Sequence, residues 1–385
     1  MGSRQIHHSQ TPCKPILRMS HIDLPKFTTT LPDPTEFWSL PHDISTASYF
    51  ITDAIYKAAL ESRIKHMPTK YPAVPQNATQ RWSNILYSND SQKIWAAIDW
   101  KGNYRDTPDN LSNPTDEQFC EYFTNLLNDT PPEQLLIPET DKFIPELDSD
   151  FEPGEIDDCI KALKSDKAAG IDGIPPGLFK SLSDEWILVL TYLFNMVFSG
   201  AYPLQWTIAR LFMIFKKGDR LSPSNYRGIS IVTAISKIYD MVLNNRFMKW
   251  FSPHFEQSGA QKGRSCSEQI LVVRLLVDIA RKLRLPLYIG FIDFQKAYDW
   301  VNRNLLLTML ADEGCSKRFL NAVAASLSTT LSRIGKSEFA STKGVRQGGP
   351  SSCALYLLCG LHDKVNQRVW PRWMARCPSL PYADG

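Results

Sequence analysis

Two aspartates in the C-terminal half of the chain stand where a carboxylate could hold a divalent cation. Asp293 lies near the end of the apolar run Leu287–Phe294, which we expect to be a strand, and Asp384 lies on an expected turn. An unpaired charge at the end of a buried strand is unfavourable unless a cation accompanies it. Carboxylates from two separate segments can hold two cations about 3.5–4 Å apart, an arrangement that promotes in-line displacement at a phosphate. Asp293 could instead be a simple strand-end residue.

The elements that would position these residues are helices mixed with short strands. Apolar residues at helical spacing predict helices over 155–163, 184–198, 235–250 and 267–283. A partly β-branched run predicts a strand over 208–215 that enters a basic turn at Lys216, and short strands are expected around Leu331 and Phe339. A further helix should begin just after Pro350. Helices and short strands without strict alternation indicate an α+β fold.

Composition divides the chain into three parts. Residues 1–40 are polar and rich in Pro, Thr and Ser, which predicts a poorly ordered tail. Residues 41–150 show mainly helical spacing and end in an acidic, proline-bearing linker of unknown role. Residues 151–385 hold the elements and the two aspartates described above.

The net charge of +3 conceals a difference between the two ends of the chain. Residues 1–150 hold 13 Lys and Arg against 20 Asp and Glu, a balance of −7, and the remaining residues hold 30 against 20, a balance of +10. A basic C-terminal part indicates a polyanionic partner. Many segments with such a balance are simply solvated surfaces, so charge alone does not show that the C-terminal part binds a polyanion.

Several classes of protein are disfavoured by the sequence. The eight cysteines are scattered without CxxC spacing, and the seven histidines form no zinc pattern. No apolar run approaches the roughly 20 residues that a membrane span needs, and residues 1–10 lack the apolar core of a signal peptide. We therefore expect an intracellular protein, cytoplasmic or nuclear, that is neither secreted nor membrane-bound.

Six blocks of sequence follow one another through the C-terminal part. They are Lys167–Pro175, Phe215–Asp219 with Asn225–Ser230, Gly263–Ser265 leading into Gln269, Phe291–Asp299, Gly344–Pro350 and Tyr382–Asp384. In this order they resemble the blocks of reverse transcriptases encoded by non-LTR (LINE-like) retrotransposons. The last three resemble the first palm motif, the second palm motif and the start of the Tyr-Ala-Asp-Asp motif. Any single block would be a weak signal, but six in the right order are a strong one.

The resemblance implies a right-hand polymerase fold with fingers and palm. Asp293 and Asp384, helped by the carbonyl of Phe294, would hold the metal ions, which would be Mg²⁺ with Mn²⁺ as an alternative. Tyr298 would lie under the sugar of the incoming dNTP and exclude a 2′-hydroxyl. The other roles that it implies are Lys216 and Arg227 at the triphosphate, Gln347 and Gly348 at the border of the nucleotide pocket, and Lys262 and Arg264 at template phosphates. Ordinary alternatives remain for several of these: a core aromatic for Tyr298, a solvated basic turn for Lys216 and a surface arginine for Arg264.

The last block departs from the family pattern. Gly385 follows Asp384 where the family has a second aspartate, and the chain then ends, so we expect an incomplete palm without a thumb. The first hypothesis is a truncated, weakly active or inactive RNA-directed DNA polymerase domain of a mobile-element polyprotein. It would use an RNA template, a DNA primer and dNTPs in a two-metal nucleotidyl transfer. The alternative is a non-catalytic remnant that binds nucleic acid. No feature indicates a protein partner.

Overall fold

The computed structural model of the chain describes residues 14–40, 43–64, 113–128, 134–253, 258–259, 261, 263–291, 295–328 and 330–352. Four of the residues expected at the site, Lys262, Asp293, Phe294 and Asp384, lie outside these ranges. Residues 1–13 of the expected tail and all of residues 65–112 also lie outside them.

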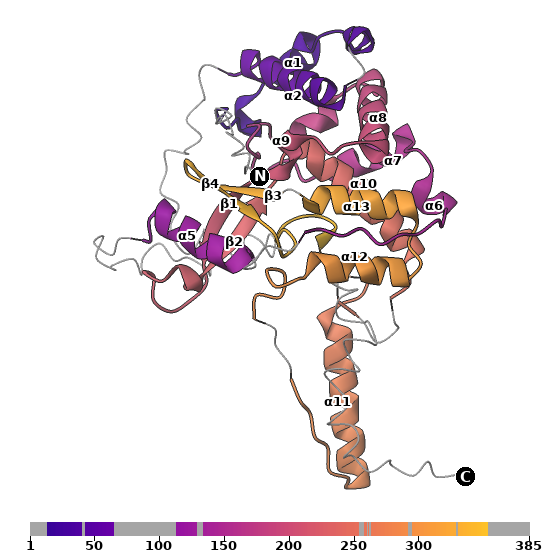
Figure 1. Cartoon of the computed structure of the whole chain (residues 1–385). Helices are drawn as coiled ribbons and strands as arrows, with labels where there is room; N and C mark the ends of the chain where they lie inside the picture. The colour runs from indigo at the N-terminus through magenta and orange to yellow at the C-terminus, as the bar shows by residue number, and fades with distance from the viewer. Residues whose placement is uncertain are drawn as a thin grey trace, which may run out of the picture.

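Four short strands form one mixed sheet with the order β2-β1-β3-β4 (Figure 1). Strand β1 (Ile208–Phe215) pairs antiparallel with β2 (Tyr226–Ile231) and parallel with β3 (Thr330–Ile334). Strand β4 (Ser337–Ser341) pairs antiparallel with β3. The predicted strand at 208–215 and the two short strands around Leu331 and Phe339 are thereby confirmed.

Most helices contribute to one large apolar core. The helices after residue 150 are α7 (Pro153–Ala162), α8 (Asp184–Ser199), α9 (Leu204–Thr207), α10 (Ala234–Trp250), α11 (Cys266–Leu283), α12 (Arg303–Asp312) and α13 (Lys317–Ser328), with short 3₁₀ turns at Pro176–Ser181 and Pro223–Asn225. Of these helices, α11 alone adds no side chain to that core. The four helices predicted over 155–163, 184–198, 235–250 and 267–283 are found within two residues of their expected ends. Local signals set these ends: the Thr233 side chain caps the start of α10, and Gly200 follows α8. The predicted α+β class is confirmed.

Residues 14–40 differ from the expected tail. They form two 3₁₀ helices, η1 (Met19–His21) and η2 (Pro34–Ser39), and the helix α1 (Leu24–Thr30), and they pack beside α2 (Ile44–Glu61). Phe27 and Phe37 are buried in the same core as α7 and α8. The sequence does contain signals for the start of a helix, since Asp23 and Asp33 cap helices that carry proline in the first turn. The prediction of a tail relied on the polar composition of the segment and did not use these signals.

Helix α5 (Asp116–Leu127) covers one face of the sheet (Figure 1). Its Phe119 and Phe123 form a second apolar cluster with one side chain from each strand of this sheet. These side chains are Leu211 (β1), Tyr226 (β2), Ile334 (β3) and Phe339 (β4). Thr115 and Gln118 form a capping box that fixes the start of the helix. The short helix α6 (Pro145–Asp148) follows it before α7. The region before residue 150 thus shares its cores with the sheet and helices that follow.

The expected strand at 287–294 is wrong in its described part. Residues 287–291 pair with no strand that the structure describes, and Tyr288 and Phe291 are 92% and 87% exposed. The apolar face of α11 just before them is exposed too, and the helix projects from the other labelled helices (Figure 1). An apolar pattern shows that a segment suits burial but does not name the surface that buries it. Among the described helices, none combines the length and the apolar character that crossing a membrane requires.

Candidate functional site

Backbone hydrogen bonds join three of the six sequence blocks. The amide of Ser230 at the end of β2 donates to the carbonyl of Gln347 at 2.8 Å. The amide of Val345 donates to the carbonyl of Tyr298 at 2.9 Å. The loop 344–348 therefore contacts both the β1–β2 hairpin and the segment that follows Asp293 in sequence.

Two glycines allow this loop to approach its neighbours. Gly344 has φ of +77° and Gly348 has φ of +113°, a region that side-chain-bearing residues rarely adopt. A Cβ at Gly344 would lie 2.9 Å from the carbonyl oxygen of Asp299. A Cβ at Gly348 would lie 2.9 Å from the carbonyl oxygen of Ser230. The glycine predicted at the pocket border is thus needed for the contact between loop and hairpin.

Replacing Gly348 with alanine is expected to lower the free energy of unfolding by roughly 1–3 kcal/mol, because the new Cβ meets backbone and the φ is strained. Thermal or denaturant unfolding measures the change. Gly154→Ala is the matched control, since no atom lies within 4 Å of a Cβ there and the residue is in helix α7. Equal stability of the two variants would contradict the contact.

Two of the predicted cations lie on one face of the β1–β2 hairpin. Lys216 follows β1, and its amide donates to the carbonyl of Asn225 at 2.9 Å. Arg227 on β2 stands opposite Ile214, so Lys216 and Arg227 are diagonal neighbours, with their Cβ atoms within about 8 Å. Both side chains are exposed. Two cations at this spacing can together neutralise a chain of phosphates.

An apolar strip lies beside these cations on the same face. Phe212 stands opposite Ile229, and the neighbouring Ile214 is also on this face; Phe212 is 57% exposed. The alternate residues of β1 turn toward α5 instead. A flat exposed aromatic and aliphatic surface suits the packing of a base. The sequence interpretation missed this strip; the alternation in 208–215 could have indicated it, but not which face α5 covers.

The segment 295–300 brings a carboxylate to the β1–β2 hairpin, where Asp299 lines one hollow with Gly228, Ser230 and Gln347. Burial raises the pKa of Asp299, and the charges of Lys296 and Lys216 oppose that rise. The Lys296 ammonium lies 4.7 Å from the ring centre of Tyr122 on α5 and hydrogen-bonds its hydroxyl. The sequence interpretation gave Asp299 and Lys296 no role.

Arg303 at the start of α12 holds the residues that lead into the loop 344–348. Its buried guanidinium donates to the carbonyls of Gly344 (3.0 Å), Leu327 (2.8 Å), Ser341 (2.8 Å) and Lys343 (3.1 Å) and to the hydroxyl of Thr330 (2.8 Å). Burial lowers the pKa of Arg303 to about 10, so the group stays cationic at neutral pH. The sequence gave no signal for this role, because an arginine in a helix is ordinary.

The far end of the loop is held by the half-buried side chains of Asp240 and Arg346. Asp240 on α10 accepts a hydrogen bond from the Ser351 amide at 3.1 Å. Burial raises the pKa of Asp240, while the Ser351 hydrogen bonds and the charge of Arg346 oppose the rise. Arg346 also donates to the carbonyls of Trp206 and Thr207. Both ends of the loop are therefore held by hydrogen bonds to charged side chains, which are buried at one end and half-buried at the other.

The block at 167–175 is seated on the start of α10. A Cβ at Gly170 would lie 2.6 Å from the carbonyl oxygen of Val232, so only glycine allows this approach. Asp172 is buried; one of its carboxylate oxygens accepts from the Ile174 amide at 3.3 Å, and the other has no hydrogen-bond partner. Burial raises the pKa of Asp172 to about 7.

The raised pKa of Asp172 predicts a stability that falls with pH. The folded state holds this proton more tightly than the unfolded state, whose pKa is near 3.8. The stabilisation is therefore complete below pH 4 and is lost as the pH rises to about 7. Asp172→Asn should lack this loss, which is at most about 4 kcal/mol. Denaturant unfolding at several pH values measures this loss of stability, with the exposed Asp141→Asn as control. If the free energy of unfolding of the native chain and of Asp172→Asn changed with pH in the same way, the prediction would be contradicted.

The remaining predicted residues are placed less closely. Tyr298 is half-buried against the main core. Arg264 lies ahead of α11 and donates to Glu268 at 2.5 Å and to the Ser258 hydroxyl at 3.0 Å. Within the described ranges, no group of three or more His, Cys, Asp or Glu side chains could hold a metal ion.

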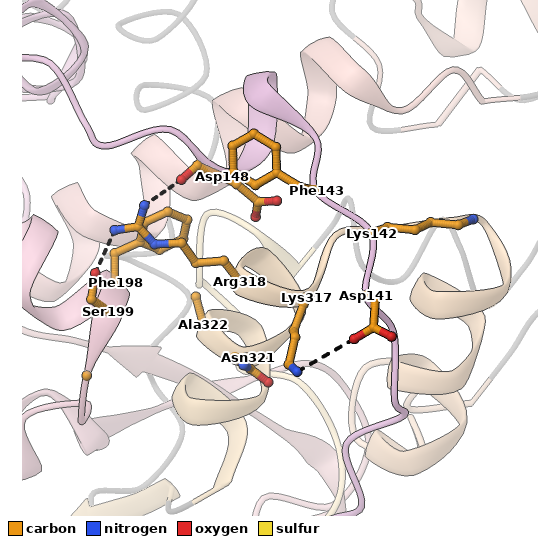
Figure 2. Close-up of a pocket in the computed structure, with 11 residues that line it drawn as sticks. Asp141, Lys142, Phe143, Asp148, Phe198, Ser199, Lys317, Arg318, Asn321 and Ala322 are labelled. Atoms are coloured by element: carbon orange, nitrogen blue, oxygen red, sulfur yellow. Dashed lines mark hydrogen bonds and ion pairs between the residues drawn. The ribbon is translucent and has the colours of Figure 1, made fainter.

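A spacious hollow lies elsewhere, between residues 141–148, the end of α8 and the start of α13 (Figure 2). It has a volume of about 490 Å³ and contains none of the predicted site residues. Arg318 lies against the Phe198 ring and donates to the Asp148 carbonyl at 2.5 Å and the Ser199 hydroxyl at 2.6 Å (Figure 2). The arginine joins three segments, so we interpret this hollow as a packing junction.

Comparison with known proteins agrees with the order of the blocks. The family described as reverse transcriptase (RNA-dependent DNA polymerase) matches residues 214–384. The Pol polyprotein of the type-1 retrotransposable element R2 of Popillia japonica is 32% identical over 180 residues, 43% of this chain and 25% of that protein. An uncharacterized 149 kDa protein of transposon TX1 from Xenopus laevis is 27% identical over 247 residues, 60% of this chain and 19% of that protein.

A third relative from Drosophila melanogaster, named "Probable RNA-directed DNA polymerase from transposon BS", is 33% identical over 155 residues, 38% of this chain and 17% of that protein. The chain thus matches only about a sixth to a quarter of the length of these curated relatives. Residues 214–384 therefore match the reverse transcriptase family. The relatives named here come from retrotransposons, so the match is to reverse transcriptase domains of the non-LTR retrotransposon kind.

Proposed function

We propose that residues 151–385 are the fingers and palm of an RNA-directed DNA polymerase and that the helices of residues 14–64 and 113–128 support them. The family acts on a nucleic-acid template and primer with dNTPs and generally uses divalent metal ions. In the proposed reaction the primer 3′-hydroxyl attacks the α-phosphate of a dNTP, a phosphodiester bond forms and pyrophosphate leaves. The observation that carries this proposal is the joining of the hairpin cations, the 298–301 segment and the glycine loop into one site.

Asp293, Asp384 and the carbonyl of Phe294 are proposed to hold Mg²⁺, with Mn²⁺ as an alternative. The donor set consists of oxygen atoms only, which suits a hard divalent cation. Such ions neutralise charge at the reacting phosphate and lower the pKa of a bound hydroxyl. Gly385 supplies no third carboxylate, so we expect weak metal binding and slow synthesis.

The described residues have proposed roles around the nucleotide. Lys216 and Arg227 bind the triphosphate through charge-assisted hydrogen bonds and stabilise the charge that develops on it. Tyr298 lies beneath the sugar and leaves no room for a 2′-hydroxyl. Gln347 and Gly348 border the nucleotide on the side of the loop. Lys262 and Arg264 are proposed to contact template phosphates, which would position the strand without reading its sequence.

Removing either hairpin cation is expected to weaken dNTP binding about 10- to 100-fold, because each charged hydrogen bond contributes roughly 1.5–3 kcal/mol. Equilibrium binding of a labelled dNTP with Mg²⁺ to Lys216→Ala and to Arg227→Ala measures this. Lys217→Ala is the matched control, since it removes the same charge from the next residue of the exposed turn. Equal weakening by the Lys217 variant would show general attraction instead of a site, and an unchanged affinity in all three would contradict the proposal.

The alternative function, a non-catalytic protein that binds nucleic acid, is favoured by one observation. Gly385 stands where the family pattern has an aspartate, so the metal site holds one carboxylate fewer. Nucleic-acid binding without nucleotide addition, in a chain that binds no dNTP, is the result that would select this function.

A further inference from the structure

Helix α5 reaches both segments that border the proposed nucleotide site, although it lies before the range 214–384 that the reverse transcriptase family matches. Its first contact is to the segment 295–300. The Lys296 ammonium donates a hydrogen bond to the Tyr122 hydroxyl and lies 4.7 Å from the centre of the Tyr122 ring. One tyrosine of α5 therefore holds this lysine through its hydroxyl and through its ring.

The second contact joins the end of α5 to the start of the glycine loop. The Leu127 carbonyl accepts hydrogen bonds from the amides of Thr342 at 3.0 Å and Lys343 at 3.2 Å. The Asn128 side chain donates to the Ala340 carbonyl on β4 at 2.9 Å. Carbonyls in the last turn of a helix have no partner within the helix, so these contacts use a group that the helix leaves available.

The backbone around Lys296 shows how a contact with its side chain can reach the site. Lys296 has φ of +51°, a value that a residue with a side chain keeps only where its surroundings hold it. Its carbonyl accepts from the amides of Asp299 at 2.9 Å and Trp300 at 3.2 Å, which closes a turn. Tyr298 lies inside this turn, and its carbonyl accepts from the Val345 amide. A shift of Lys296 would therefore move Tyr298.

The same helix supplies part of the lining between the hairpin and the glycine loop. Phe123 and Leu127 line the hollow that Asp299 shares with Gln347. Tyr122 precedes Phe123 in the sequence, and the two rings pack edge to face with centres 5.1 Å apart. The contacts of α5 are thus made at the border of the proposed site.

We propose that Tyr122 is a positioning residue of the nucleotide site, which holds the turn 296–300 through Lys296 and so sets the place of Tyr298 beneath the sugar. The consequence is sugar selection. Without Tyr122 the turn relaxes, Tyr298 moves, and an rNTP with its 2′-hydroxyl binds more nearly as well as a dNTP. The role at the sugar rests on the proposed function, whereas the holding of the turn does not.

Hydrogen exchange followed by mass spectrometry tests the holding of the turn in the free chain. Tyr122→Leu removes hydroxyl and ring, whereas Tyr122→Phe removes the hydroxyl alone and keeps the packing of α5. Tyr49→Leu is the matched control, since Tyr49 is an exposed tyrosine on α2 with the Lys14 ammonium 6.0 Å from its ring centre. Circular dichroism melting verifies that each variant folds.

Peptides that cover 295–301 should exchange about 10-fold faster in Tyr122→Leu, because the loss of a hydrogen bond to a charged group shifts a local opening equilibrium by at least about that factor. Tyr122→Phe should show a smaller increase in the same peptides. Tyr49→Leu should exchange at the native rate there. Native exchange of these peptides in both Tyr122 variants would overturn the proposal.

Equilibrium binding of a labelled dNTP and of the matching rNTP, each with Mg²⁺, tests the consequence for the sugar. The ratio of the two affinities is measured, because a general loss of stability lowers both affinities and leaves their ratio unchanged. The preference for dNTP should fall on the order of tenfold in Tyr122→Leu, as the loss of a residue that orients a binding group generally causes. It should stay native in Tyr49→Leu.

A double variant shows whether Tyr122 acts through Tyr298. Tyr298→Ala should lower the preference for dNTP by itself. Adding Tyr122→Leu to it should lower the preference no further, because residues that act through one contact are not additive. A native preference in Tyr122→Leu, or additive losses in the double variant, would overturn the role of Tyr122 in sugar selection.

These outcomes are separate from those of the proposed function. A native chain that binds no dNTP, or that binds dNTP and rNTP alike, would refute the proposed nucleotide site and with it the role in sugar selection. Faster exchange in Tyr122→Leu would then still show that Tyr122 holds the turn. A native chain that prefers dNTP, with native exchange in both Tyr122 variants, would support the proposed function and refute the role of Tyr122.

Discussion

Replacement of Arg303 by methionine is expected to lower the free energy of unfolding by about 3–5 kcal/mol, as the loss of one partner of a buried charged network generally does. The guanidinium donates to six acceptors, which belong to residues 327–330 and 341–344. Methionine has a similar length but no donor, so these buried oxygens lose their partner. Urea unfolding followed by circular dichroism measures the change.

Two further variants make the Arg303 result specific. Arg274→Met removes an exposed arginine that pairs with Asp278 and should change stability by less than about 1 kcal/mol. Arg303→Lys should recover little of the stability lost in Arg303→Met. The three donors of an ammonium group sit on one nitrogen and cannot reach acceptors that are spread around the planar guanidinium of the arginine. A methionine variant as stable as the native chain would show that the network around the loop 344–348 does not hold the fold.

Replacement of Gly385 by aspartate is expected to raise Mg²⁺-dependent nucleotide addition on the order of tenfold or more, because a further carboxylate strengthens a site for hard divalent cations. The Mg²⁺ concentration at half-maximal rate should fall as well. Primer extension at a series of Mg²⁺ concentrations measures both effects. Gly385→Asn is the matched control, since asparagine has the same shape without the charge. Asparagine and aspartate variants with equal rates, or no change in either, would contradict the proposed metal ligands.

Secondary structure was predictable where local pattern decides it. Helices α8 and α10 carry apolar residues at helical spacing over four turns or more, and β1 ends at the residue before Lys216, as its β-branched run indicates. The segment 14–40 was not predictable from composition, because its few apolar residues, such as Phe27, are buried by contact with distant helices. The opposite case is the run 287–291, whose apolar residues suggested a buried strand. In the described structure these residues are exposed, because no described element packs against them.

The site was predictable in part. Lys216, Arg227 and Gly348 could be named because each belongs to a block whose order along the chain carries information. Phe212 and Ile229 could not, since their shared face follows from strand register and from the position of α5. Arg303 and Asp240 act through contacts with residues far away in sequence, and a single buried charge in a helix gives no local signal of its partner. Non-local pairing is the information that one sequence lacks.

Primer extension on an oligo(dT)-primed poly(A) template, with Mg²⁺ and then Mn²⁺, tests the central claim most directly. The native chain and Gly385→Asp are each compared with the corresponding Asp293→Asn variant. We expect slow dNTP addition by the native chain, faster addition by Gly385→Asp and none once Asp293 is replaced. Addition that continues without the Asp293 carboxylate, or no addition by folded Gly385→Asp, would contradict the assignment of a polymerase site to this domain.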